Sequence, residues 1–247
     1  MTLFLTSSPC DDNVPAGVSL PCILDSSNGF VDNLRDCWKP DSRLVVICSD
    51  AHNYILNDEM CDTFTGCFRY HGLTVSKSVM LDGRNERDAA RIVTLSDVIL
   101  LGGGHVPTQS EFFARIGLRR LLRGYTGVII GVSAGSMNCT NPVYAQPELP
   151  GESIDPAFER FIPGLGLSDV QILPHYQMVK DNLLDGKRLF EDITFGDSHG
   201  RSFYALVDGS YVMKRGGRYT LHGEGYLIRD GRMERICRRG ESIDIIP

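Results

Sequence analysis

Short apolar runs alternate with segments of helical periodicity through the first half of this chain. The predicted strands are 2–6, 43–49, 73–81, 97–101 and 127–132, and the predicted helices are 30–38, 54–70, 86–95 and 108–122. Most of these strands are apolar throughout, which is typical of a sheet covered on both faces. The alternation predicts an α/β fold: a three-layer α/β/α sandwich around a mostly parallel, doubly wound sheet.

The pattern changes in the second half. Residues 141–166 are rich in Pro, Glu and Gly and predict a long irregular segment, which in a compact domain is more often functional than idle. Residues 170–176 predict a strand and 182–193 a helix, and short β-type runs with glycine turns then predict extra C-terminal strands that extend the sheet. No repeat or linker divides the chain, so we expect one domain over residues 1–247.

One stretch carries a chemical signal. Gly131-Val-Ser133-Ala-Gly135 follows a predicted strand and fits the G-x-S-x-G pattern of a nucleophile elbow. A serine on such a sharp strand-to-helix turn needs neighbours without bulk, and its Oγ projects from the end of the sheet. The alternative is a tight turn with a capping serine. A nucleophile would also require a base and oxyanion donors elsewhere in the chain.

The glycine run Gly102–Gly104 follows another predicted strand. Parallel strands present their carboxyl ends at one edge of the sheet, so we expect this run near Ser133. The backbone N–H groups of these glycines, together with that of Ala134, are candidate oxyanion donors. A phosphate-binding loop is the rival interpretation, but the chain has neither G-x-G-x-x-G after its first strand nor G-K-[ST].

His175 is the candidate base because it follows Ile172-Leu-Pro174 at the end of a predicted strand. The alternative is a strand-end histidine that hydrogen-bonds only to backbone. His105 directly follows the glycine run, and we interpret it as a loop residue or a substrate contact.

Composition excludes several classes of function. The net charge of −6 argues against a nucleic-acid partner. No apolar run approaches the ~20 residues that span a bilayer, and the N-terminus lacks the features of a signal peptide, so we expect no membrane partner and a cytoplasmic location. The eight cysteines form no C-x-x-C pair and the six histidines are scattered, so we expect no metal site and no cofactor.

Taken together, the glycine run, the later Gly-x-Ser-Ala-Gly-Ser and the Leu-Pro-His-Tyr at 173–176 resemble peptidase family S51, over roughly residues 43–209. This family comprises the aspartyl dipeptidases (peptidase E) and the cyanophycinases. The resemblance implies a fold related to class I glutamine amidotransferases and Ser–His–acid catalysis without a metal. It makes Ser133 the nucleophile and His175 the base, with Gly103 or Gly104 and Ala134 as oxyanion donors.

The resemblance also implies the third triad member. In the dipeptidases a carboxylate lies on a late strand, and the matching stretch here, 204–209, offers Asp208. Asp197 and Glu191 are the alternatives. Asp208 could instead be a turn-forming residue before Gly209.

Two substrate contacts follow from the same resemblance. Family members carry an acidic residue between the elbow and the histidine, and Glu148 is its counterpart here. It would hold the free α-amino group of a substrate; the alternative is a solvated loop glutamate. The dipeptidases read an N-terminal aspartate with an arginine after the histidine, for which Arg188 and the adjacent Lys187 are candidates.

We therefore predict a serine-type exopeptidase, similar to dipeptidase E, that cleaves short peptides through an acyl-enzyme. One alternative is a cyanophycinase-like hydrolase of β-aspartyl-arginine units. The other is an inactive relative that binds small ligands. The expected partner is a small peptide, and a homodimer is left open.

Overall fold

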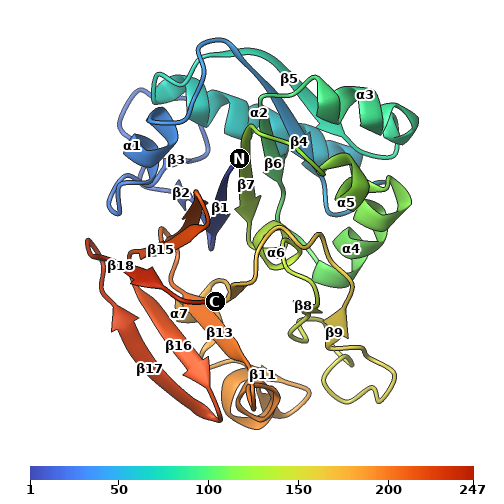
Figure 1. The fold of residues 1–247 in the computed structure, drawn as a ribbon, viewed down its shortest axis with the longest axis vertical. Coiled ribbons are helices and arrows are strands. Elements are labelled where there is room, and N and C mark those ends of the chain that lie inside the picture. Colours follow the sequence, from blue (N-terminus) through green and yellow to red (C-terminus); the bar gives the residue numbers. More distant parts are fainter.

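The computed structural model describes all 247 residues and is built around a sheet of eight strands (Figure 1). In spatial order these are β18 (Ser242–Ile245), β15 (Arg218–His222), β14 (Tyr211–Arg215), β1 (Thr2–Thr6), β7 (Val128–Val132), β6 (Val98–Leu101), β4 (Ser42–Ile47) and β5 (Val75–Leu81). The last five in this order are parallel, and each of the first three is antiparallel to its neighbours. The predicted α/β class with a mostly parallel central sheet is confirmed.

Helices cover both faces of the parallel part. They are α1 (Phe30–Arg35), α2 (Tyr54–Tyr70), the 3₁₀-helix η1 (Glu86–Asp88), α3 (Ala89–Thr94), α4 (Val106–Arg115), α5 (Leu118–Leu121) and α6 (Ala134–Met137). The chain steps outward from β4 to β5, then back across the sheet to β6 and β7. Because such crossovers are right-handed, α2 lies on one face while α3 and α4 lie on the other, where both contact α5 (Figure 1).

The central strands are apolar because both faces are buried. Every residue of β1 and β6 is buried, and in β4 only Arg43 is exposed. The apolar side chains of these strands belong to one continuous cluster of buried residues. No helix combines the length and the apolar character that crossing a membrane requires.

A second sheet, of four strands, lies beside the first (Figure 1). It contains β10 (Gln171–Leu173), β13 (Ser202–Leu206), β16 (Gly225–Arg229) and β17 (Arg232–Cys237). The prediction that the C-terminal strands extend the main sheet is right for β14 and β15, and β18, which was not predicted, joins them at the edge of the sheet. The prediction is wrong for β13, β16 and β17, because β13 pairs with β10, and β16 and β17 form a hairpin on its other side.

The remaining elements are small. Three two-stranded ribbons pair β2 (Cys10–Asp11) with β3 (Ile23–Leu24), β8 (Val143–Tyr144) with β9 (Phe161–Ile162), and β11 (Leu183–Leu184) with β12 (Lys187–Arg188). The other helices are α7 (Tyr176–Val179), the π-helix η2 (Leu189–Thr194) and α8 (Phe195–Asp197).

Two predicted helices differ from the structure, and a residue with positive φ explains each. The predicted helix 182–193 is instead the β11–β12 hairpin followed by η2, because Asp185 and Gly186 form the turn with φ of 51° and 80°. The predicted helix 108–122 is interrupted at Gly117, which has a φ of 65° and separates α4 from α5.

The turn from β7 into α6 is packed too closely for any side chain at two of its positions. A Cβ on Gly131 would lie 2.7 Å from the Cα and backbone nitrogen of Ser136 in α6. A Cβ on Gly135 would overlap the carbonyl oxygen of Leu101 at the end of β6. The glycines of the G-x-S-x-G pattern therefore let α6 approach the ends of β6 and β7.

We expect Gly135→Ala to lower the free energy of unfolding by about 1–3 kcal/mol, because backbone must move to admit the methyl group. Gly196→Ala is the matched control, since a Cβ there meets nothing within 4 Å. Its effect should stay within about 0.5 kcal/mol. Urea unfolding measures the free energy of unfolding of both variants. Equal values for the two would contradict the close packing of Gly135 against Leu101.

Candidate active site

The candidate site lies where the carboxyl ends of strands from the two sheets meet. Ser133 directly follows β7 of the main sheet, and Ser7 directly follows the neighbouring β1. His175 follows β10 of the second sheet. Asp208 follows β13, which is parallel to β10 with Leu173 opposite Ala205. This register brings the ends of β10 and β13, and hence His175 and Asp208, to one place.

Ser133 occupies a strained backbone conformation. Its φ is 51° and its ψ is −114°, values that cost a non-glycine residue on the order of 1–3 kcal/mol. Its backbone N–H is shared between the carbonyl oxygens of Thr6 at 3.1 Å and Ser7 at 3.0 Å. These hydrogen bonds to the end of β1 hold the turn, so the elbow depends on the neighbouring strand.

Three side chains form a continuous hydrogen-bonded series. The Nε2 of His175 lies 2.9 Å from the Oγ of Ser133, and its Nδ1 lies 2.8 Å from the Oδ1 of Asp208. An ionised carboxylate can only accept hydrogen bonds, so Nδ1 carries the imidazole proton and Nε2 is free to accept the Ser133 hydroxyl proton. This is the arrangement that activates a serine nucleophile.

Asp208 is held as a carboxylate by several donors. Burial alone would raise its pKa, but hydrogen bonds from His175, Ser7 and Gln177 and the charge of His175 outweigh burial and lower the pKa. The Ser7 hydroxyl donates to Oδ1 at 2.6 Å, and the side-chain amide of Gln177 donates to Oδ2. The backbone N–H of Asp208 in turn donates to the Gln177 side chain at 3.1 Å.

Ser7 also fixes the base. The backbone N–H of His175 donates to the Ser7 hydroxyl oxygen at 2.7 Å. His175 has a φ of 57°, an uncommon value for a residue other than glycine, so its backbone needs such support. Ser7 therefore contacts both the candidate base and the candidate acid.

Backbone donors lie beside the serine. Gly103 is adjacent to Ser133, because a Cβ on Gly103 would lie 3.6 Å from the Ser133 Cβ. The N–H groups of Gly103 and Gly104 donate to no protein acceptor, whereas that of Gly102 donates to the Ile47 carbonyl at 2.9 Å. Ala134 begins α6, so its N–H has no partner within the helix.

A buried amide pair fixes the glycine segment. Gln109 Nε2 donates to the Gly102 carbonyl at 2.7 Å, and Asn138 Nδ2 donates to Gln109 Oε1 at 2.9 Å. Gln109 belongs to α4 and Asn138 caps the end of α6. These hydrogen bonds therefore connect the segment after β6 to α4 and α6.

The Glu148 side chain contacts the chain just after the glycine run Gly102–Gly104. Its Oε1 accepts the backbone N–H of Val106 at 3.1 Å and lies 4.0 Å from His105 Nε2. The Glu148 side chain is 43% exposed. Its partial burial raises the pKa of the carboxyl, and the rise is opposed by the Val106 N–H and by the charges of His105 and His175. Glu152 accepts from His105 Nε2 at 2.8 Å and from the N–H of Glu148 at 2.8 Å, so it holds this loop against α4.

The other predicted residues lie in separate interactions. Arg188 pairs with Asp192 at 2.6 Å, and none of its hydrogen bonds involves the serine, histidine and aspartate series. Asp197 pairs with Arg160 at 2.7 Å and accepts from Tyr144. Glu191 makes no hydrogen bond to His175, whose carboxylate partner is Asp208.

Comparison with known proteins identifies the family to which the chain belongs. The family model for peptidase family S51 matches residues 32–222. The chain belongs to peptidase family S51. No curated protein matches this S51 chain in sequence.

The fold of this S51 protein is similar to that of a solved structure, a candidate peptidase E from Listeria monocytogenes EGD-e. The TM-score is 0.54 at 16% sequence identity, and the match covers 96% of this chain and 98% of that one. At this identity the likeness concerns the fold alone.

Sequence reasoning missed Ser7, Gln177 and Glu152. Ser7 had a usable signal, because it directly follows the first predicted strand and parallel strands end at one edge. Gln177 and Glu152 had none, since their contacts depend on how α7 and the loop after Glu148 fold.

The depressed pKa of Asp208 predicts a pH-dependent contribution to the stability of this S51 protein. Its stabilisation is present above the unfolded pKa of about 4 and is lost as pH falls through the lower folded pKa. The stability difference between wild type and Asp208→Asn should therefore be largest near neutral pH and shrink below about pH 4. Urea unfolding across this range, with exposed Asp12→Asn as control, tests the expectation. A difference that is constant with pH would contradict it.

Proposed function

We propose that this protein is a serine peptidase that releases residues from the amino terminus of short peptides. The observation that carries the proposal is the series from the Ser133 hydroxyl through His175 to Asp208. Unpartnered N–H groups beside the serine support it. The inactive alternative is less well supported, because Asp208 supplies a carboxylate at hydrogen-bond distance from His175.

In the proposed reaction, Ser133 Oγ attacks the scissile carbonyl carbon while His175 Nε2 takes the hydroxyl proton. Gly103 or Gly104, with Ala134, donates N–H groups to the developing oxyanion. His175 then protonates the leaving amine as the C–N bond breaks, which leaves an acyl-enzyme. His175 then takes a proton from a water molecule as it attacks the ester carbonyl, and returns this proton to Ser133 Oγ as the ester C–O bond breaks and the acid product leaves. Asp208 keeps the imidazole oriented and stabilises its charged form throughout.

Glu148 accounts for the proposed action at the amino terminus. Its carboxylate accepts the backbone N–H of Val106, two residues after the glycine run Gly102–Gly104. A substrate α-ammonium group beside it would form a charge-assisted hydrogen bond and fix the peptide by its first residue. The specificity for N-terminal aspartate implied by the family is part of the proposal. The proposal also includes a fold related to class I glutamine amidotransferases and a single catalytic domain over the whole chain.

Ser133→Ala should reduce kcat/KM for dipeptides by about 10⁴-fold or more, because the nucleophile is lost. Ser136→Ala, which removes a neighbouring hydroxyl bonded to the Thr6 carbonyl, is the control and should retain hydrolysis. Amino-acid release from α-aspartyl, alanyl and β-aspartyl-arginine dipeptides measures both activity and preference. Preference for the β-aspartyl substrate would favour the cyanophycinase-like alternative. Undiminished hydrolysis by Ser133→Ala would refute the mechanism.

Glu148→Gln should lower kcat/KM about 10- to 100-fold for peptides with a free amino terminus, since a charge-assisted hydrogen bond is lost. The effect should fall mainly on KM and should be absent for N-acetylated peptides. The matched control is Glu159→Gln, an exposed glutamate in the same irregular segment. Equal losses on free and acetylated peptides would contradict the assigned role.

A further inference from the structure

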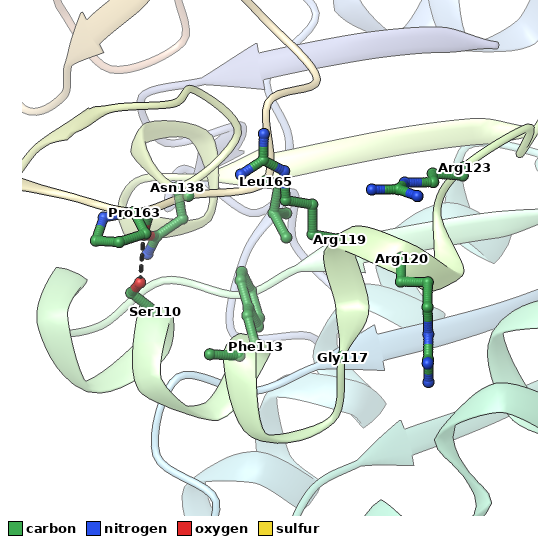
Figure 2. A pocket seen from close by; sticks show the side chains of 11 residues that line it. Ser110, Phe113, Gly117, Arg119, Arg120, Arg123, Asn138, Pro163 and Leu165 are labelled. Carbon is green, nitrogen blue, oxygen red and sulfur yellow. Dashed lines mark hydrogen bonds between the residues drawn. The ribbon is translucent and has the colours of Figure 1, made fainter.

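A separate cavity contains an unusual concentration of positive charge. It has a volume of about 290 Å³ and lies between α4, α5 and the segment 163–165 (Figure 2). Arg119, Arg120 and Arg123 line it, and no acidic residue does. The chain as a whole carries a net charge of −6, so the cluster does not reflect the overall composition.

These three guanidinium groups have no internal counter-ion. None takes part in any ion pair of the structure, although Arg115, four residues before Arg119, pairs with Glu86 at 3.0 Å. Arg119 and Arg123 are four residues apart, and both also line an adjoining hollow of about 410 Å³. All three arginines are exposed to solvent, and the Arg120 side chain points away from those of Arg119 and Arg123 (Figure 2). An anion bound between Arg119 and Arg123 would supply the negative charge that both lack.

Apart from the polar side chains of Ser110 and Asn138, the rest of the lining is apolar or glycine. Phe113 is buried in α4, and Pro163 and Leu165 form part of the facing wall (Figure 2). Arg119 reaches toward this wall, since a Cβ on Gly166 would lie 3.4 Å from its Nη2. A ligand that fits must combine a small apolar body with an anionic group.

We propose that this cavity binds a small organic anion. Its apolar body packs against Phe113 and Leu165, and its carboxylate or phosphate lies between Arg119 and Arg123. The planar guanidinium fork matches both of these groups. The volume is at the lower end of the range for small-molecule sites, which fits a ligand the size of an acylated amino acid.

The cavity is separate from the proposed catalytic residues. Ser133 precedes α6, whereas Asn138, which lines the cavity, caps the other end of that helix. The five residue steps from Ser133 to Asn138 correspond to about 7–8 Å along the helix axis. A ligand can therefore bind here without contacting the nucleophile, and the proposal does not rest on the peptidase function.

The test is calorimetric titration of the full-length Ser133→Ala protein, which prevents turnover of the probes. The probes are N-acetylphenylalanine, its uncharged amide and phenyl phosphate. We expect at least one anion to bind about tenfold or more tightly than the amide. Comparison of N-acetylphenylalanine with phenyl phosphate identifies whether carboxylate or phosphate is preferred.

Arg119→Gln/Arg123→Gln, made in the same background, should abolish the preference for the anion. Arg239→Gln, which removes an exposed arginine outside the cavity, should leave it intact. Circular dichroism verifies that each variant is folded. Equal binding of anion and amide, no saturable binding of either anion at millimolar concentration, or unchanged binding by the double variant would each overturn the proposal.

Discussion

The hydroxyl group of Ser7 connects the two sheets at the point where the candidate active site lies. It accepts the backbone N–H of His175 and donates to the carboxylate of Asp208, and both of these residues follow strands of the second sheet. The carbonyl of the same residue accepts the N–H of Ser133 in the main sheet. One residue at the end of β1 thus contacts the candidate nucleophile, base and acid, and their geometry depends on how the two sheets meet.

Two of the five non-glycine residues with positive φ lie at the same place. Ser133 and His175 both have positive φ, 51° and 57°, and their side chains are hydrogen-bonded to each other. Such conformations persist only where the surroundings enforce them. Here the enforcement comes from the end of β1 and from the close packing of α6 at Gly131 and Gly135. The fold stabilises this arrangement at a cost in local conformational energy.

Much of this arrangement could be predicted from the sequence, because it follows from local rules. Apolar runs predicted the parallel strands, and the glycines around Ser133 predicted a turn that the packing at Gly135 explains. Residues at strand ends identified Ser133 and His175, which the structure brings together. The second sheet could not be predicted. The apolar sequence of 202–206 indicates a strand but does not show whether that strand pairs with β10 or with β14. The hairpin at 183–188 was missed although Asp185-Gly186 is a hairpin-type turn pair, because the apolar spacing of 182–193 also fits a helix. The Asp185 carboxylate accepts the N–H groups of Gly151 and Ser153, contacts that the sequence does not reveal.

The central claim is that Ser133 is a nucleophile activated by His175 and Asp208. The most direct measurement is covalent labelling by a fluorophosphonate probe, followed by peptide mass spectrometry to locate the adduct. The account predicts a single adduct on Ser133, formed much more slowly in His175→Ala and absent in Ser133→Ala. An adduct on another residue, or labelling of Ser133 at the same rate without His175, would contradict it.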